Sequence, residues 1–180
     1  MTCSVDDLWT EIRSIPDYPR PGIDFKDITP LLGNHELFET AVQLLVQPFR
    51  GSVEKVAGIE ARGFILGAPA AYLLGVGFVP MRKPGKLPGK VYSESYKLEY
   101  GEAVLELDRD ALRPGQRVLI VDDVIATGGT VEAAIRLVRS AGAVPSSVAV
   151  LLDLCFPEAR SRIDGIGLHA VLATREKLLK

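Results

Sequence analysis

The chain has 180 residues, of which 47% are hydrophobic and 24% charged, so it can bury a sizeable core and is not a disordered chain. Its net charge of -2, without any block of like charges, argues against a nucleic-acid-binding surface or a membrane-binding patch. The N-terminus lacks the basic start and apolar run of a signal peptide, and no segment reaches the ~20 apolar residues of a membrane span. Cys3 and Cys155, the two cysteines, show no metal-ligand spacing. We expect one cytoplasmic domain, residues 1–180, with reduced thiols.

The first quarter of the chain alternates between helical and extended patterns. The stretch SVDD, an N-cap followed by an acidic turn, predicts a short helix that ends before Pro16. Residues 16–25, PDYPRPGIDF, hold three prolines and a glycine and predict a stiff, extended segment that is neither helix nor central strand. Residues 35–49, HELFETAVQLLVQPF, have the i, i+3, i+4 apolar spacing of a helix up to Pro48.

From residue 53 onward, strongly apolar strand patterns alternate with helical patterns of about a dozen residues. The predicted strands are residues 53–60, 76–82, 117–124, 146–154 and 168–174, and the predicted helices are residues 63–75, 130–142 and 157–163. This alternation predicts an α/β fold, a doubly wound, mainly parallel sheet covered by helices on both faces. Ligands of such sheets bind beyond the carboxyl ends of the strands.

Residues 82–107 break the alternation. Their first half, RKPGKLPGK, is basic and rich in proline and glycine, and their second half alternates between apolar and polar residues. This predicts a long mobile loop that leads into an antiparallel strand. A polar loop of this length in a compact domain is typical of a lid over a site, here about residues 83–98.

The most informative motif is VLIVDDVIATGGT, residues 118–130. Asp122 and Asp123 end an apolar strand and supply acceptors that suit the vicinal hydroxyls of a sugar. The turn that follows opens a helix, where backbone N–H groups and the helix dipole favour an anion such as a phosphate. We call this turn the cradle; its residues are Ala126, Thr127, Gly128, Gly129 and Thr130.

Rival interpretations of this motif are weaker. The chain has neither the GxxxxGK[ST] motif of nucleotide triphosphatases nor a GxGxxG motif after its first strand. The alternative without a ligand is an ordinary glycine-rich turn beside solvated acids, which is what a lone Gly-Gly pair usually indicates. A phosphoacceptor signalling domain also uses paired acids on an α/β sheet, but it has no use for the cradle or the lid.

The motif resembles the phosphoribosylpyrophosphate-binding motif of the type I phosphoribosyltransferases. The resemblance extends over almost the whole chain, through DYPRPGIDFKDITPLL, AGIEARGF, MRKPGKLPG and SYKLEYG in that order. It implies the fold of that family with a small N-terminal hood, about residues 15–33, and a flexible antiparallel lid. It also implies a typical homodimer that acts on small molecules, with Mg²⁺ as cofactor bound mainly through substrate oxygens.

The implied reaction is displacement of pyrophosphate from ribose C1 by a purine nitrogen. Arg62 would contact the pyrophosphate from a turn that in the family contains a non-proline cis peptide, here Glu60-Ala61. Glu99, beside Tyr100, would act as general acid or base, although by alternation alone it is an ordinary outward-facing acid. Further cations for the pyrophosphate are Arg82, Lys83 and Lys86, whose structural alternative is a solvated charge run.

The resemblance places the purine against the hood residues Asp24, Phe25 and Lys26. The family commonly has an apolar residue at position 24 and arginine at position 26, so the choice of base depends on whether backbone or side chains make the contacts. Adenine is the expected base, with AMP and pyrophosphate as products. Hypoxanthine, guanine or xanthine, or a regulator that senses phosphoribosyl pyrophosphate, are the alternatives. His35 and His169 have no partner motif and are interpreted as structural or exposed rather than catalytic.

Overall fold

The computed structural model describes residues 3–97, 102–163 and 165–174. The chain divides into two compact units, Met1–Leu44 and Leu45–Lys180, which are described separately. Among the described residues, none of the helices combines the length and the apolar character that a bilayer crossing requires.

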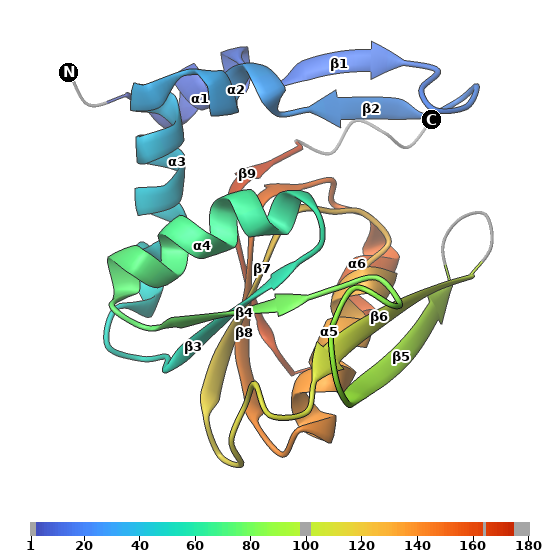
Figure 1. Cartoon of the computed structure of the whole chain (residues 1–180). Helices are drawn as coiled ribbons and strands as arrows, with labels where there is room; N and C mark the ends of the chain where they lie inside the picture. The colour runs from blue at the N-terminus through green and yellow to red at the C-terminus, as the bar shows by residue number, and fades with distance from the viewer. Residues whose placement is uncertain (1–2, 98–101, 164, 175–180) are drawn as a thin grey trace. The chain divides into compact units, whose positions relative to one another are not determined.

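The first unit contains helices at both ends and a β-hairpin between them (Figure 1). Its elements are α1 (Val5–Thr10), β1 (Arg13–Pro16), β2 (Asp24–Asp27), α2 (Thr29–Gly33) and the start of α3 (His35–Val46), which continues into the short 3₁₀ helix η1 (Gln47–Phe49). The predicted N-cap is present, because Ser4 and Asp7 exchange hydrogen bonds in a capping box.

The proline-rich segment forms the turn of this hairpin. β1 and β2 pair antiparallel, with Ile15 opposite Phe25. The Asp17 carboxylate accepts a 2.7 Å hydrogen bond from the Gly22 N–H and closes the connecting loop. The expectation that no central strand would form here is confirmed, since the two strands make a separate two-stranded sheet.

The second unit contains a five-stranded sheet in which all neighbouring strands are parallel, in the order β4-β3-β7-β8-β9. The strands are β3 (Lys55–Ile59), β4 (Gly77–Met81), β7 (Arg117–Ile125), β8 (Val144–Asp153) and β9 (Gly167–Ala173). β7 lies in the centre, and its residues Val118, Leu119, Ile120 and Val121 are all buried because helices cover both of its faces. The predicted α/β fold is confirmed.

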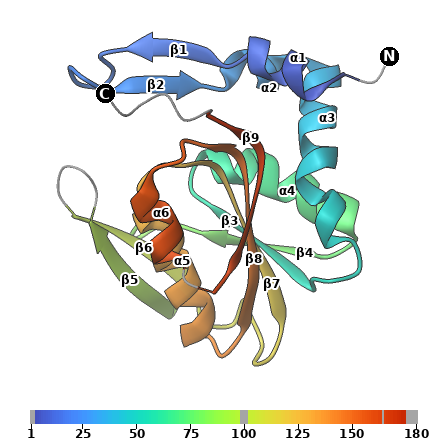
Figure 2. The same cartoon turned by 180° about the vertical axis from the view of Figure 1, so that it is seen from behind.

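Helices cover both faces of this sheet (Figures 1 and 2). They are α4 (Arg62–Leu74), α5 (Gly129–Ser140) and α6 (Pro157–Arg162). Parallel crossovers are right-handed, and the crossover through α4 leads to the β4 edge whereas those through α5 and α6 lead to the β9 edge. Because these crossovers run toward opposite edges of the sheet, α4 lies on one face and α5 and α6 lie on the other.

The segment predicted as an antiparallel lid contains a connection followed by a pair of strands. Val91–Lys97 forms strand β5, which pairs antiparallel with β6 (Glu102–Asp108), the antiparallel strand that was expected. Tyr92 and Tyr96 share one face of β5 and pack against the core of the second unit. Proline and glycine end at Gly89, so they mark only the connection that precedes the strand.

Asp27, at the end of β2, is one of the buried charged residues and organises the first unit. Its carboxylate accepts hydrogen bonds from the backbone and hydroxyl of Thr29 and from the Arg13 guanidinium. These donors, with the two from Thr29 contributing most, lower the pKa of Asp27 from 3.8 to about 2.

We expect Asp27→Asn to lower the free energy of unfolding at pH 7 by about 1–3 kcal/mol, because the amide loses the charge-assisted bonds. A lowered folded-state pKa adds stability that is full above the unfolded value of 3.8 and is lost as pH falls through about 2. Urea unfolding from pH 7 to pH 2 should therefore show the stability difference between the two proteins narrowing steadily below pH 4. Asp110→Asn, an exposed acid outside the helices, is the control and should leave stability unchanged; a constant deficit for Asp27→Asn at every pH would contradict the assignment.

Candidate functional site

The topology of the sheet singles out the carboxyl ends of β3 and β7. These strands are neighbours, and the crossovers that leave them run toward opposite edges of the sheet. At such a switch point the loops after the two strands separate and leave a crevice in which α/β proteins bind ligands. Glu60-Ala61-Arg62 follows β3, and the cradle follows β7.

Two carboxylates lie at the end of β7. Asp123 is buried, with 5% of its surface exposed, whereas Asp122 retains part of its accessible surface. The Asp122 Oδ1 atom accepts a 2.9 Å hydrogen bond from the backbone N–H of Asp123. Adjacent carboxylates repel each other, so this arrangement requires a cation or a ligand that offers donors.

Arg62 supplies the cation. Its Nε atom lies 2.7 Å from the buried Asp123 Oδ2 atom, which forms an ion pair. Oδ2 nevertheless accepts no aligned hydrogen bond from any described residue, because the separation is short but the N–H direction is poor. A buried carboxylate oxygen in this state can still accept a bond from a hydroxyl group.

Gly63 allows α4 to approach β7 closely enough for this ion pair. A Cβ atom at Gly63 would lie 2.8 Å from the Val121 carbonyl oxygen and 3.0 Å from the Asp122 Oδ1 atom. The neighbours are backbone and a carboxylate that is itself bonded, so they cannot move aside without moving β7. The residue was not among the predicted site residues, although its place in ARGF between strand and helix was visible in the sequence.

Asp122 is the residue of the site whose protonation is most perturbed. Burial raises the pKa of its carboxyl group well above 3.8, and the neighbouring charge of Asp123 raises it further. The Asp123 N–H and the Arg62 guanidinium oppose the shift without cancelling it. Such a costly pair of acids at a switch point is typical of a functional site.

The cradle has the features of an anion site. α5 begins at Gly129 and has no side-chain cap, so the N–H groups of its first turn have no partners within the helix. Gly128 precedes the helix with φ of 81°, and a Cβ atom there would lie 2.9 Å from the Ala159 Cα atom. Both constraints require glycine. Thr127 and Thr130 are half-buried at the two ends of the turn, where each hydroxyl is a potential donor.

Of the three predicted cations after β4, Arg82 is the one whose side chain pairs with a residue of the loop after β3. The Arg82 guanidinium lies 3.4 Å from the Glu60 carboxylate, and the backbone N–H of Lys83 donates a 2.8 Å bond to the same carboxylate. These donors, with the Lys83 N–H contributing most, lower the pKa of Glu60. The Arg82 side chain therefore lies at the end of β3. The Glu60-Ala61 peptide bond at this strand end is cis, which confirms the cis bond implied by the resemblance. The side chains of Lys83 and Lys86 belong to exposed residues.

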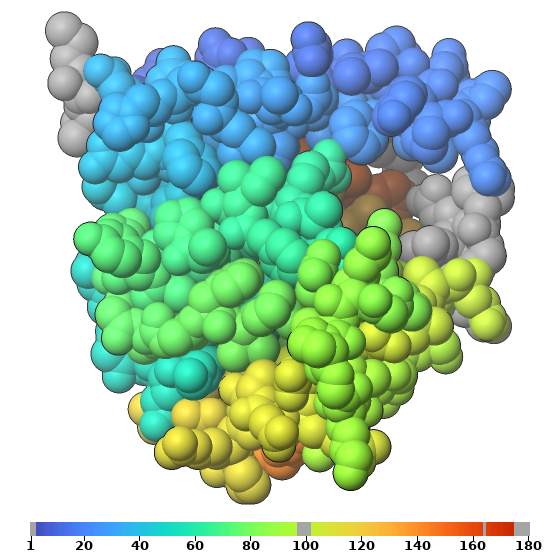
Figure 3. Space-filling view, viewed as in Figure 1, coloured from blue at the N-terminus to red at the C-terminus, as the bar shows by residue number. Residues whose placement is uncertain are grey.

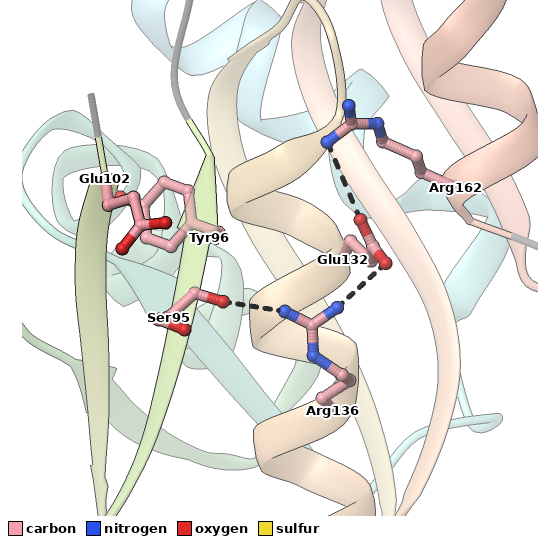
Figure 4. Close-up of a pocket in the computed structure, with 6 residues that line it drawn as sticks. All are labelled: Ser95, Tyr96, Glu102, Glu132, Arg136 and Arg162. Carbon is pink, nitrogen blue, oxygen red and sulfur yellow. Dashed lines mark hydrogen bonds and ion pairs between the residues drawn. The ribbon is translucent and has the colours of Figure 1, made fainter. Parts of the chain in front are cut away.

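The β5–β6 hairpin is fixed to α5 by one arginine (Figure 4). Arg136 donates to the Glu94 carboxylate, the Glu132 carboxylate and the Ser95 carbonyl over 2.8–2.9 Å. Arg162 lies 3.6 Å from Glu132 on the opposite side. An open pocket of about 450 Å³ lies between the hairpin and α5, and it is lined by Ser95, Tyr96, Glu102, Glu132, Arg136 and Arg162.

Two groups of predicted site residues are not part of the described geometry of the second unit. Glu99 and Tyr100 lie outside the described residues. Asp24, Phe25 and Lys26 lie together on β2 in the first unit. There the Lys26 Nζ atom lies 2.6 Å from the Asp24 carboxylate, and the Phe25 ring packs edge-to-face on Tyr18 with centroids 5.3 Å apart. Their role in binding a base stays a prediction.

Comparison with known proteins agrees with this geometry. Residues 34–160 match the phosphoribosyl transferase domain family. The adenine phosphoribosyltransferase of Desulfitobacterium hafniense is 52% identical over 162 residues, which covers 89% of this chain and 94% of that protein.

Two solved structures superpose on almost the whole chain. The adenine phosphoribosyltransferase of Thermoanaerobacter pseudethanolicus has a TM-score of 0.91 at 46% identity, covering 94% of this chain and 99% of that one. The APRTase of Giardia lamblia complexed with 9-deazaadenine has a TM-score of 0.92 at 38% identity, covering 97% and 99%.

We expect Asp122→Asn to leave the melting temperature at pH 7.5 equal to or above that of the unchanged protein. A raised folded-state pKa means that the folded state binds more protons than the unfolded state, so stability falls as pH rises from 3.8 through the folded value. The amide removes this cost and keeps an acceptor for the Asp123 N–H. Differential scanning calorimetry should show the advantage shrinking below pH 4, where both states are protonated.

The matched control for this variant is Asp110→Asn, which changes an exposed acid and should not shift the melting temperature at any pH. A clear loss of stability in Asp122→Asn at pH 7.5 would show that the ionised carboxylate stabilises the fold, contrary to the assignment.

Proposed function

Since the chain belongs to the family of adenine phosphoribosyltransferases, we propose that it transfers the 5-phosphoribosyl group of phosphoribosyl pyrophosphate to adenine. The products are AMP and pyrophosphate. The C1–oxygen bond to pyrophosphate breaks, a bond from C1 to a ring nitrogen of adenine forms, and that nitrogen loses its proton.

The observation that supports this most directly is that hydrogen-bond acceptors and hydrogen-bond donors lie next to each other at the switch point. Asp122 and Asp123 offer carboxylate oxygens suited to two neighbouring hydroxyls, and the cradle offers backbone N–H groups suited to a phosphate. A ribose 5-phosphate carries both groups at opposite ends of one ring. The Asp123 Oδ2 atom fits this role, because it is buried, it accepts no hydrogen bond from the described residues, and a hydroxyl of the sugar would supply one.

The pyrophosphate side of the reaction requires positive charge. Arg62, at the first position of α4, is the cation closest to the acids, and its planar guanidinium matches phosphate oxygens. Arg82 is held near the same strand end by Glu60, and Lys83 and Lys86 follow on an exposed segment. We propose that these four cations stabilise the charge that builds up on pyrophosphate as it leaves.

Cleavage at C1 passes through a state with oxocarbenium character, so charge at the sugar and access of water both matter. The Asp122 and Asp123 carboxylates lie on the sugar side, where negative charge stabilises a developing cation. The β5–β6 hairpin, anchored by Arg136, is the element suited to limit access of water. Glu99, in the segment between its strands, is proposed to manage the proton of the purine.

Magnesium is proposed as the cofactor, and the residues present fit a loosely held ion. The described residues contain no group of three acidic, histidine or cysteine side chains that would hold a metal by themselves. The ion would be held mainly by diphosphate and ribose oxygens and water, with Asp122 and Asp123 as the nearest carboxylates. When bound, it supplies charge neutralisation to the diphosphate.

The base is proposed to bind at the hood residues. Asp24 and Lys26 pair with each other over 2.6 Å, and we propose that the Phe25 ring and the backbone of β2, rather than these two charged side chains, contact the purine. That arrangement favours the family's adenine preference despite the unusual residues at positions 24 and 26. Another purine base is the alternative, and it keeps the rest of the mechanism unchanged.

We also propose a cytoplasmic homodimer. Cys3 and Cys155 are free thiols, as in a reducing compartment. α4 lies at the surface of the second unit (Figure 3), and its residues Ile65, Tyr72 and Leu73 are exposed, with Tyr72 at 84%. An exposed apolar helix face of this kind is suited to a self-complementary interface.

The test of the function is an assay of adenine, hypoxanthine, guanine and xanthine as acceptors with phosphoribosyl pyrophosphate and Mg²⁺. We expect kcat/KM for adenine to exceed that of each other base by ~100-fold or more, because unpaired polar edges in a base site are costly. Asp122→Asn/Asp123→Asn should raise the KM for phosphoribosyl pyrophosphate in the same assay. No AMP formation, or preference for a 6-oxopurine, would overturn the proposal.

Glu99→Ala should lower kcat by ~100-fold or more, as expected for loss of a general acid or base. Steady-state kinetics at saturating substrates would measure this, with Glu102→Ala on the adjacent strand as a control that should retain most activity. A loss of less than about threefold in kcat would leave Glu99 with a packing role only.

A further inference from the structure

A third buried carboxylate, Asp153, lies at the carboxyl end of β8 and has no part in the proposed reaction. It is 1% exposed. Its Oδ1 atom accepts a 2.7 Å bond from the Cys155 N–H, and its Oδ2 atom accepts a 2.8 Å bond from the Arg160 guanidinium on α6. Burying an acid is costly even when it is paired, so a reason other than stability is required.

The register of the sheet places this carboxylate next to the cradle. Asp153 is the direct partner of Ile125, the residue before Ala126, and the Leu154 N–H donates a 3.0 Å bond to the Ile125 carbonyl. The Thr174 N–H, after β9, donates to the Asp153 carbonyl over 2.9 Å. Asp153 therefore joins the carboxyl ends of three neighbouring strands.

The helix that carries Arg160 forms the back wall of the cradle. α6 has six residues and no side-chain cap, so it contributes little stability of its own. Its Ala159 is 1% exposed and packs against Gly128 so closely that a Cβ atom there would lie 2.9 Å from the Ala159 Cα atom. Any shift of α6 changes the space available to Gly128 and hence the direction of the cradle's N–H groups.

We propose that Asp153 and Arg160 are a positioning pair that sets the geometry of the cradle for the 5-phosphate. Arg160 ties α6 to the strand ends, and it also neutralises a buried negative charge one residue away from an anion site. The inference deepens the proposed function and rests on it, since it takes the cradle as the phosphate site.

The test is the kinetics of Arg160→Met with phosphoribosyl pyrophosphate and adenine varied separately. We expect the KM for phosphoribosyl pyrophosphate to rise by ~10-fold, with the KM for adenine and kcat within about threefold, because only the phosphate end is affected. Arg160→Lys, which keeps the charge, should recover most of the loss. Arg139→Met, an exposed arginine on α5, is the matched control and should change nothing.

Charge can be separated from packing by a double variant. Arg160→Met leaves the Asp153 carboxylate uncompensated, so Asp153→Asn/Arg160→Met should bind phosphoribosyl pyrophosphate more tightly than Arg160→Met alone. Calorimetric titration with ribose 5-phosphate measures the same site without catalysis, and the affinity should fall in parallel with the rise in KM.

An unchanged KM for phosphoribosyl pyrophosphate in folded Arg160→Met, even with a lower melting temperature, would overturn the positioning role and leave the proposed function intact. If Arg160→Met does not fold, Arg160→Gln, which also removes the positive charge, decides by the same measurement. Failure of the unchanged protein to form AMP, by contrast, would refute the proposed function itself.

Discussion

The site depends on the repulsion between two adjacent carboxylates at the end of a central buried strand. Asp122 and Asp123 are placed where water is scarce, and one arginine lies close enough to offset them. The raised pKa of Asp122 expresses the remaining cost. Apolar residues at these two positions, like those in the preceding four positions of β7, would avoid the cost of burying charge. The cost of burying two adjacent carboxylates is explained if the hydroxyls of a sugar donate hydrogen bonds to them.

Other features of the second unit serve to keep this pair in place. The switch point between β3 and β7 brings the start of α4 beside the acids, and Gly63 permits the close approach. After β7, Gly128 and Ala159 are packed backbone to backbone in the same manner, so α6 supports the cradle from one side. Both contacts rely on the absence of a side chain. Both involve single glycines whose replacement would displace the backbone of a neighbouring element.

The sequence was informative where chemistry and periodicity coincide. The apolar run of β7, its acids and the glycine turn predicted the site, and the alternation of elements predicted the parallel sheet. The alternating residues after Gly89 predicted an antiparallel strand after the lid loop, but the pattern alone did not divide this segment into the two strands β5 and β6. Gly63 and the Asp153–Arg160 pair were missed for a different reason. Their roles depend on contacts between elements that are distant in sequence, which a local pattern does not contain.

The most direct test of the account is a crystal structure of the protein with AMP bound. The ribose hydroxyls should lie within hydrogen-bonding distance of the Asp122 and Asp123 carboxylates, and the phosphate should contact the backbone N–H groups of residues 126–130. A nucleotide bound elsewhere, or one whose phosphate contacts Arg62 while its ribose lies away from the two acids, would contradict the central claim.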